Sequence, residues 1–591
     1  MVKNFVASLS ISLLLVVGTV MAQPARVQID ANKILHPINP WLYGINTARW
    51  DESLFPGPTD EMLMTADRDA IEKIKASGVT LLKYPGGNDA DQYVWNSAAN
   101  NASEMNTDEY IALCREVGAE PFITVNFNES PDLAAEWVRY CNILKGYHVK
   151  LWEVGDEQWG TWARGHAAPE EYAKKYISFV KAMRAVDPTI KVATNVPLGL
   201  HPENWAERVL KAAGEYVDMM TYTFFPQPSG KENDDTLLTS VGKFRSLVSK
   251  LRSDVEQAVG PQKAASIFFI NVGYNSVSHS PGPQTLEMIN AIWTADMLGT
   301  MAGLGTDISC FWALHNFYPP RGGDYGYISS EGSNTPYYSY YVFPMLSQHL
   351  KGDLIAVNSS DPAVSAYASR FGKTLSLILI NKDKRSQKSV EIDLKNFAPH
   401  ARAKAWVLDE KRKYEQLSDI SQDSERFPVN VPPYSVTAMD LIDRDSVIPP
   451  INLARQAVPT ASSYSTIGPH FKAASAIDGK LYTRWNSAAW TKSNGQEAQW
   501  FQLVWPKMQQ IGSVRICWGE TFGADYKLLS SIDGKIWVTL REVTNGHGGV
   551  EEIAVANIQA RYLKIDGSRG AKGISAYSIR EIEVYEQSTA K

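Results

Sequence analysis

Two hydrophobic patterns follow one another along this chain of 591 residues. From Trp41 to about Leu350, short apolar runs alternate with longer stretches whose apolar residues recur every three or four positions. This alternation is typical of parallel strands joined by amphipathic helices. We expect strands at 41–46, 80–84, 121–126, 150–155, 191–195, 218–224, 267–272 and 308–314, and helices at 65–76, 107–117, 131–144 and 169–186. Eight such units predict a (β/α)8 TIM barrel, with a doubly wound open sheet as the alternative.

The pattern changes after Thr335-Pro336, where short strands of alternating apolar and polar residues predict an antiparallel β-sandwich. An early strand at 27–30 precedes the barrel and is a candidate to join that sandwich. Pro449-Pro450 marks a linker, and the remaining residues again read as strands only. We therefore expect a multidomain chain, with a TIM-barrel domain at 23–350, a β-sandwich at 351–445 and a further β-sandwich at 451–587.

The N-terminal residues have the order of a secretory signal peptide. Lys3 precedes an apolar run from Phe5 to Val20, and small residues lead up to Gln23. This predicts a signal peptide at 1–22 and a secreted or periplasmic protein. An N-terminal membrane anchor is the alternative, but the run is short for a spanning helix. No later segment is apolar enough to cross a bilayer.

Composition narrows the choice of partners. The net charge is −6 and the pI is about 6.0, without the clustered Lys and Arg of a nucleic-acid-binding surface. The four cysteines have neither metal-ligand spacing nor a disulfide framework. Cys114 and Cys141 lie in neighbouring helical segments and are close enough in sequence to pair, although free buried thiols are the preferred interpretation. No phosphate-binding loop or His/Cys cluster is present, so no catalytic cofactor is expected.

The last segment carries several motifs in series. They are Ala474–Gly479, Thr483–Trp485, Gln499–Leu503, Tyr526–Gly534, Arg561–Ile565 and Ile579–Tyr585. Together they resemble the discoidin (coagulation factor 5/8 type C) family, whose fold is a jelly-roll β-sandwich. The resemblance implies a carbohydrate-binding domain, with a protein- or lipid-binding discoidin domain as the alternative.

The same resemblance implies a structural Ca²⁺ in the C-terminal domain. Asp478, Thr483 and Glu581 would supply oxygen ligands of the kind that Ca²⁺ prefers, together with backbone carbonyls. Lys480 departs from the family pattern after the glycine. Sugar contacts are expected from the aromatic residues Tyr464, Phe471 and Trp490.

Polar residues follow the predicted barrel strands, where the reactive groups of TIM barrels lie. Two strings stand out: Tyr84-Pro85-Gly86-Gly87-Asn88 and Trp152-Glu153-Val154-Gly155-Asp156-Glu157. They resemble the retaining glycoside hydrolase clan with a TIM barrel, particularly its α-L-arabinofuranosidase and β-xylosidase branches. The resemblance implies hydrolysis of O-glycosidic bonds in a glycan or polysaccharide. Substrate contacts are expected from five residues, namely Asn46, Asn88, Asn126, Tyr274 and Trp312.

In that clan the second carboxylate of the fourth-strand motif is the general acid/base, which here is Glu157. The residue before it is usually an Asn that contacts a sugar hydroxyl, and here it is Asp156. A second negative charge at this place raises the pKa of one of the two carboxyl groups. Both residues are therefore candidates for the catalytic pair.

The seventh strand departs from the clan. Aligning Tyr274-Asn275-Ser276 with its nucleophile motif places Gly273 where the nucleophilic Glu belongs. Glycine cannot form a glycosyl-enzyme. Three interpretations stay open: hydrolysis without that nucleophile and with inversion, a non-catalytic carbohydrate-binding pseudoenzyme, or a nucleophile elsewhere, such as Glu331. For the first, the candidate bases are Asp51, Asp89, Asp91 and Asp324.

Overall fold

The structure is a computed structural model. It describes residues 25–51, 67–97, 104–199, 204–316, 321–329, 333–400, 402–418, 420–421, 424–444, 452–465, 471–479, 483–489, 498–519, 521–571 and 576–586. The predicted signal peptide at 1–22, the 449–450 linker, Glu331, Lys480 and Trp490 lie outside these ranges. All statements below concern the described residues.

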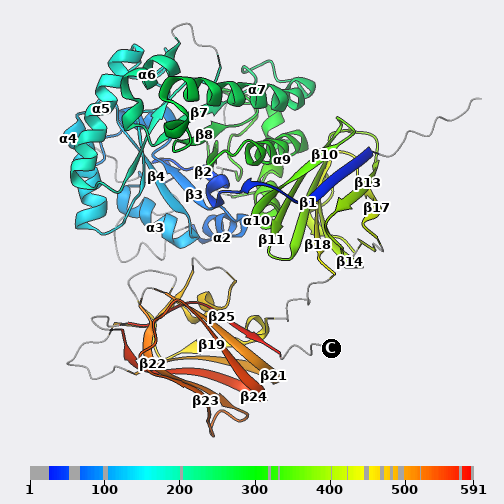
Figure 1. Ribbon diagram of the computed structural model, residues 1–591. Helices are drawn as coiled ribbons and strands as arrows, with labels where there is room; N and C mark the ends of the chain where they lie inside the picture. Colours follow the sequence, from blue (N-terminus) through cyan, green and yellow to red (C-terminus); the bar gives the residue numbers. More distant parts are fainter. Residues whose placement is uncertain are drawn as a thin grey trace, which may run out of the picture.

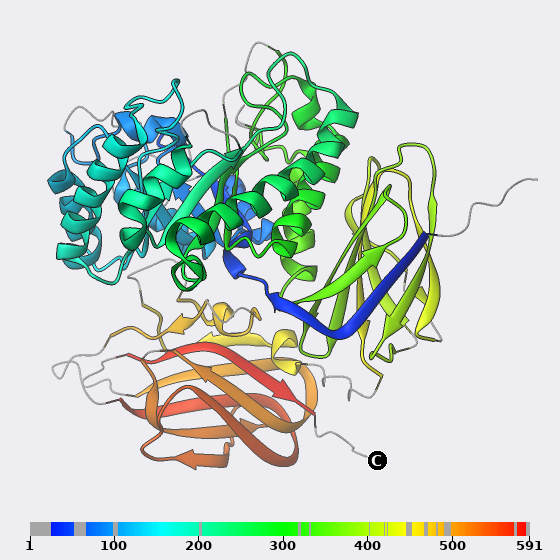
Figure 2. The same cartoon turned by 45° about the horizontal axis from the view of Figure 1, so that its top comes forward.

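Eight parallel strands close into a barrel, which confirms the predicted fold class (Figures 1 and 2). The strands are β2 (Gly44–Asn46), β3 (Leu81–Tyr84), β4 (Glu120–Val125), β5 (Leu151–Val154), β6 (Lys191–Asn195), β7 (Met219–Phe224), β8 (Phe268–Tyr274) and β9 (Ile308–Phe311). Gly44 pairs with Cys310, so β9 closes on β2. A Cβ at Gly44 would lie 2.4 Å from the Ser309 carbonyl oxygen, which is why this seam uses glycine.

The barrel is surrounded by helices. They are α2 (Arg68–Ser77), α3 (Thr107–Val117), α4 (Pro131–Val138), α5 (Pro169–Val186), α6 (Trp205–Ala213), α7 (Asp234–Val259), α9 (Met288–Gly303) and α10 (Tyr338–His349). The bounds of α3 have a local cause, because Asn106 and Glu109 form a capping box and Gly118 ends the helix in the left-handed conformation. The helix predicted at 131–144 is confirmed, and its second half over Arg139–Leu144 has π-helical hydrogen bonding.

The barrel interior changes character along its axis. One layer is apolar and includes Leu81, Phe122 and Leu151. Two residues further along β3 and β5 the inward side chains are Lys83 and Glu153, both almost fully buried. Because strand side chains alternate, this shift places ionic groups at the carboxyl ends of the strands, where TIM barrels carry their chemistry.

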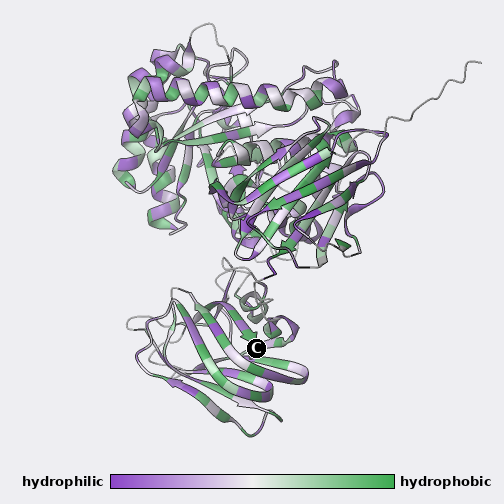
Figure 3. Cartoon of the chain, turned by 45° about the vertical axis from the view of Figure 1, so that its right-hand side comes forward, coloured by the Kyte–Doolittle hydropathy of each residue, from purple (hydrophilic) through white to green (hydrophobic). Residues whose placement is uncertain are grey.

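A ten-stranded sheet forms the sandwich beside the barrel. Its first strand is β1 (Ala25–Pro37), which pairs antiparallel with β10 (Asp353–Ser359) and parallel with β13 (Lys388–Lys395). The remaining strands are β11 (Val364–Phe371), β12 (Thr374–Asn381), β14 (Arg402–Leu408), β15 (Lys413–Gln416), β16 (Ile420–Ser421), β17 (Arg426–Val431) and β18 (Ser435–Ile442). Hydrophobic and hydrophilic residues alternate along these strands (Figure 3). The Tyr367 hydroxyl donates to Asp296 of α9 at 2.6 Å and so ties the sandwich to the barrel.

The C-terminal domain is a second β-sandwich with its own core around Trp485, Phe501 and Trp505. Its strands are β19 (Val458–Ala461), β20 (Trp485–Asn486), β21 (Gln499–Trp518), β22 (Gly523–Ser531), β23 (Val538–Val543), β24 (Val550–Gly570) and β25 (Ser578–Tyr585). All four cysteines are free and buried, as the preferred interpretation of the sequence had it. Within the described ranges, none of the helices has the length and apolar character that crossing a membrane requires.

Candidate active site

The loop after β5 holds Glu157 in an unusual backbone conformation. Gly155 and Glu157 have φ angles of 68° and 57°, in the left-handed region. Glycine adopts this region freely, whereas for a glutamate it costs free energy that the surroundings must offset. A Cβ at Gly155 would also lie 2.1 Å from the Gln158 side-chain oxygen. The turn therefore depends on this glycine, and it points the Glu157 side chain where a regular strand end would not.

Asp91, a candidate base by sequence, instead fixes this loop. Its carboxylate accepts hydrogen bonds from the backbone N–H groups of Phe127 and Asp156 at 2.9 and 3.0 Å, and from the Gln158 amide at 2.6 Å. Burial raises the pKa of Asp91 to about 7, although these hydrogen bonds oppose the shift. Asp91 is thus a positioning residue for the backbone that carries Glu157.

The Glu157 carboxyl group has two hydrogen-bond donors. Thr223 Oγ1 donates to Oε1 at 2.5 Å, and Trp162 Nε1 donates to Oε2 at 2.7 Å. Burial and then the charge of Asp156 raise the pKa of Glu157, while these hydrogen bonds lower it. A carboxyl group that keeps its proton above its ordinary range is what general-acid catalysis requires.

A buried ion cluster lies beside Glu157. Lys83 Nζ is 2.9 Å from Asp156 Oδ1 and 3.1 Å from Glu153 Oε2. Thr124 and Thr221 donate their hydroxyl protons to the two oxygens of Glu153 at 2.7 and 2.5 Å. Burial raises the pKa of Glu153, although the charge of Lys83 opposes the shift. One ammonium thus faces two carboxylates, and Glu157 adds a third.

Asn88 links this cluster to the Tyr-Pro-Gly-Gly-Asn string. Its amide donates to Asp156 Oδ2 at 2.7 Å and to the Asp156 carbonyl at 3.1 Å. It also lowers the pKa of Glu157 by a side-chain hydrogen bond. Asn88 therefore orients the two carboxylates of the catalytic pair, and the structure brings Asn88, Asp156 and Glu157 together.

Gly273 lies directly beside this group. It pairs with Thr223 across β7 and β8. A Cβ at Gly273 would lie 3.4 Å from Thr223 Cγ2 and 3.6 Å from the Phe225 ring, which is ordinary van der Waals contact. Because the hydroxyl of the same Thr223 binds Glu157, the position without a carboxylate is one side chain away from Glu157.

A β-bulge sets the direction of the side chains at this end of β8. Tyr222 pairs with Asn271 and Thr223 with Gly273, so Val272 is the extra residue. Tyr274 is consequently turned outward, where it is fully buried between Trp293 and Phe311. The Tyr274 side chain therefore packs against Trp293 of α9, and its contact with substrate stays a prediction.

Two of the predicted asparagine contacts have structural partners instead. Asn46 donates its amide protons to the carbonyls of Val272, Cys310 and Phe311 at 2.9–3.2 Å, and so holds the seam of the barrel. The Asn126 oxygen accepts from the backbone N–H of Asn128 at 2.8 Å, and its amide donates to the Tyr93 carbonyl at 3.3 Å. Their amide nitrogens therefore bind the scaffold, and the substrate contacts of Asn46 and Asn126 stay predictions.

Aromatic rings gather around the Gly86-Gly87 turn. Ideal Cβ atoms at Gly86 and Gly87 would lie 3.0 Å from the Trp50 ring and 2.8 Å from the Trp312 ring, and both glycines have positive φ. The glycines thus allow two indole rings to pack on the backbone. Trp162 is 59% exposed while its N–H binds Glu157. Partly exposed indoles beside a carboxyl pair suit the apolar faces of a sugar ring.

Three of the other candidate bases already have partners. Asp89 pairs with Arg49 at 2.6 Å. Asp51 accepts from the Thr47 hydroxyl at 2.7 Å and from the Ala48 N–H at 2.9 Å. Asp324 accepts from the Gly326 N–H at 2.8 Å. None of these contacts involves Glu157 or Gly273.

The C-terminal residues expected around Ca²⁺ come together. The Thr483 hydroxyl donates to Asp478 at 2.8 Å, and the Gly479 N–H donates to Glu581 at 3.0 Å. Burial and the charge of Asp478 raise the pKa of Glu581 to about 7. Repulsion between these two carboxylates is what a bound cation would relieve. Among the described residues no group of three or more His, Cys, Asp or Glu side chains is arranged to hold a metal ion, so the Ca²⁺ site stays a prediction. Arg455 lies against Gly479 and supplies some positive charge.

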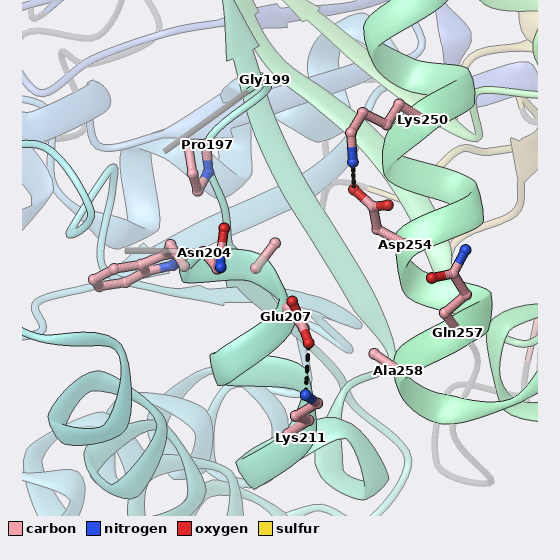
Figure 4. Close-up of a pocket in the computed structure, with 11 residues that line it drawn as sticks. Pro197, Gly199, Asn204, Glu207, Lys211, Lys250, Asp254, Gln257 and Ala258 are labelled. Atoms are coloured by element: carbon pink, nitrogen blue, oxygen red, sulfur yellow. Dashed lines mark hydrogen bonds and ion pairs between the residues drawn. The ribbon is translucent and has the colours of Figure 1, made fainter. Parts of the chain in front are cut away.

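The cavity in Figure 4, of about 310 Å³, lies between α6 and α7. Its charged side chains pair with each other, Lys211 with Glu207 and Lys250 with Asp254. None of the residues predicted for the site lines it. The candidate site, at the carboxyl ends of β3, β5, β7 and β8, is thus distinct from this cavity.

Known proteins resemble both the C-terminal domain and the part of the chain that precedes it. Residues 459–582 match the F5/8 type C domain family. The C-terminal domain is an F5/8 type C domain. A probable α-L-arabinofuranosidase C of Aspergillus clavatus is 27% identical over 203 residues, which cover 28% of this chain and 40% of that protein. An intracellular exo-α-(1→5)-L-arabinofuranosidase of Streptomyces lividans is 26% identical over 259 residues, covering 37% of this chain and 39% of that protein.

The chain thus spans about 40% of the length of these curated relatives. Among solved structures, an α-L-arabinofuranosidase of Thermotoga maritima in complex with arabinose superposes with a TM-score of 0.61. It has 20% sequence identity and covers 71% of this chain and 100% of that one. The resemblance of the barrel and first sandwich to arabinofuranosidases is thereby confirmed.

Sequence reasoning assigned no role to Lys83 or Trp162. Lys83 stands in an apolar strand, and a lone lysine between apolar neighbours was the available signal for a buried ion cluster. Trp162 reaches Glu157 because the chain turns at Gly160, where an added Cβ would lie 2.4 Å from the Trp162 ring. The contact between Trp162 and Glu157 depends on the conformation of this turn, which the pattern of apolar and polar residues does not predict.

Proposed function

We propose that this chain is an exported glycoside hydrolase in which Glu157 protonates the leaving oxygen of an O-glycosidic bond. One observation carries the proposal. Glu157, with a raised pKa, is held by Thr223 and Trp162 immediately beside the vacant Gly273 position. The relatives point to arabinofuranosides as the first substrates to examine.

With Gly273 at the end of β8, the anomeric carbon must be attacked by a group that does not belong to this strand. Direct attack by water, with inversion, is the simplest such reaction, and it needs a second carboxylate as base. Asp51, Asp89, Asp91 and Asp324 would each have to leave their present partners to serve. The missing carboxylate also supports a second candidate function, a non-catalytic carbohydrate-binding pseudoenzyme.

The F5/8 type C domain would hold the protein on its glycan, with Asp478, Thr483 and Glu581 around a structural Ca²⁺. Tyr464 is 57% exposed and is available for a sugar, whereas Phe471 lies under the guanidinium of Arg484. Export to the periplasm or the medium rests on the order of residues at the N-terminus.

The test is a glycan panel with product analysis and calorimetry on the full chain. Hydrolysis predicts released sugar from the parent and none from Glu157→Gln. Heat of binding without any product from the parent would instead establish the pseudoenzyme. A Glu157→Gln variant as active as the parent would remove Glu157 from the mechanism.

A further inference from the structure

Two residues depart together from the arabinofuranosidase pattern, and both are neighbours of Glu157. Asp156 precedes it in the sequence, and Gly273 pairs with the Thr223 whose hydroxyl binds it. Gly273 removes a carboxylate from the side of Thr223. Asp156 adds one at the residue before Glu157. The pair of changes moves a carboxylate from one place to the other and leaves the charge of the site unchanged. A cleft that had only lost its activity would have no need of the second change.

The space beside Gly273 is suited to a small, partly apolar group. The atoms nearest to an ideal Cβ there are the Thr223 methyl at 3.4 Å and the Phe225 ring at 3.6 and 3.7 Å. A side chain at position 273 would thus approach Thr223, whose hydroxyl binds Glu157. These nearest groups are a methyl group and a phenyl ring, which favour a methyl group over a hydrated ion.

Asp156 supplies a hydrogen-bond acceptor beside Glu157. A carboxyl group has about four lone-pair sites. Lys83 occupies one at Oδ1 and Asn88 one at Oδ2. The remaining sites leave room for one N–H donor of a ligand. An asparagine in the same place would offer fewer acceptors and no charge to balance a developing cation.

We propose that the substrate is a 1,2-trans-linked 2-acetamido-2-deoxy glycoside, whose own acetamido oxygen replaces the missing nucleophile. This rests on the proposed function and names its substrate class. The acetamido group occupies the space of the absent glutamate side chain, with its methyl group against Thr223 and Phe225 and its N–H on Asp156. Glycosidases that use the substrate in this way need no nucleophilic carboxylate on the protein.

The reaction balances in two steps. In the first, the acetamido oxygen forms a bond to C1 while the C1–oxygen bond to the leaving group breaks, and Glu157 gives its proton to that oxygen. The product is an oxazolinium ion, whose N–H donates to the Asp156 carboxylate. In the second, water attacks C1 and gives a proton to Glu157. The bond between C1 and the former acetamido oxygen breaks, which restores the acetamide. Two inversions at C1 give net retention, and one water molecule is consumed.

The experiment compares matched chromogenic substrates on the full chain. They are the p-nitrophenyl β-glycosides of N-acetylglucosamine and N-acetylgalactosamine, their 2-hydroxy counterparts, and p-nitrophenyl α-L-arabinofuranoside. We expect release from an acetamido sugar at least 100-fold faster than from its 2-hydroxy counterpart, with retained configuration by NMR; the factor is about what one well-placed catalytic group supplies. Successive fluorination of the acetamido methyl should slow release step by step, because it weakens the attacking oxygen.

Faster release from the 2-hydroxy sugars or the arabinofuranoside, or an inverted product, would overturn this inference and leave the proposed function standing. Release from none of the substrates would overturn both. Asp156→Asn supplies an independent readout. It should lower kcat on the acetamido substrate by about 100-fold, the scale of a single catalytic group, and weaken binding of the corresponding sugar thiazoline. An unchanged kcat and thiazoline affinity in that variant would remove Asp156 from the mechanism.

Discussion

The ends of β5 and β8 meet through one threonine, and they differ in almost every respect. The end of β5 carries Glu157, with a strained turn, two hydrogen-bond donors and a buried ion cluster beside it. The end of β8 carries Gly273, where an added Cβ would make only ordinary van der Waals contacts, the nearest with Thr223 and Phe225. Strained backbone and buried charge cost free energy. Such strain is concentrated at functional sites, which agrees with the proposed role of Glu157 as proton donor.

The largest effect is expected from Glu157→Gln. It keeps the shape of the side chain and removes the proton, so kcat on substrates with poor leaving groups should fall by about 10³-fold, within the range of general-acid catalysis. Substrates with a good leaving group, such as a dinitrophenolate, should lose far less. Equal losses on both kinds of substrate would mean that Glu157 positions the sugar and does not protonate it.

Substitution of the buried Lys83 tests how much its ion pairs with Glu153 and Asp156 stabilise the fold. Lys83→Met leaves Glu153 and Asp156 without their ammonium, and breaking a buried pair from one side costs about 3–5 kcal/mol of unfolding free energy. Urea denaturation measures this loss. The matched control is Lys211→Met, which breaks the exposed Lys211–Glu207 pair, and exposed pairs contribute about 0–1 kcal/mol. Similar losses in both variants would show that the cluster is not a stabilising unit.

The pH dependence distinguishes the two neighbours of Glu157. The acid must be protonated, so kcat/KM should be lost as pH rises through the raised pKa of Glu157. Asp156→Asn removes the repulsion that raises this pKa, and the alkaline limb of the residual activity should move to lower pH. If the alkaline limb does not move, burial alone raises the pKa of Glu157.

Trp162→Phe should act in the opposite direction and more weakly. The indole N–H stabilises the ionised carboxylate, so its loss should move the alkaline limb to higher pH. Because Trp162 is more than half exposed, we expect a fall in kcat/KM of about tenfold or less, which corresponds to about 1.4 kcal/mol of one charge-assisted hydrogen bond. A shift of the alkaline limb to lower pH would show that the Trp162 N–H does not stabilise the ionised form of Glu157.

The same comparison separates what the sequence predicts from what it leaves open. The eight strands and the Glu157 motif follow from hydrophobic periodicity and a local string of residues. The end of β8 does not, because one extra residue at Val272 reverses the faces that follow and turns Tyr274 outward. A glycine within a strand, such as Gly273, is a signal for a bulge, but it does not identify the extra residue or the side chains that are turned.

The polar residues of the barrel illustrate the same limit. Asn46 and Asn126 follow strands just as Asn88 does, yet only Asn88 binds the catalytic pair. Their roles depend on which backbone groups lack partners across the barrel. The residues that hold the loop of Glu157, such as Asp91, come from a different strand connection and meet it only in three dimensions.

The most direct test of the account is covalent trapping with 2-deoxy-2-fluoro glycosides, followed by intact mass measurement of the parent and of Gly273→Glu. Because a Cβ at Gly273 makes only ordinary contacts, the variant should fold and place a carboxylate beside Glu157. We predict a glycosyl adduct on Gly273→Glu and none on the parent. An adduct on the parent would show that another carboxylate of this chain is the nucleophile, and would contradict the account.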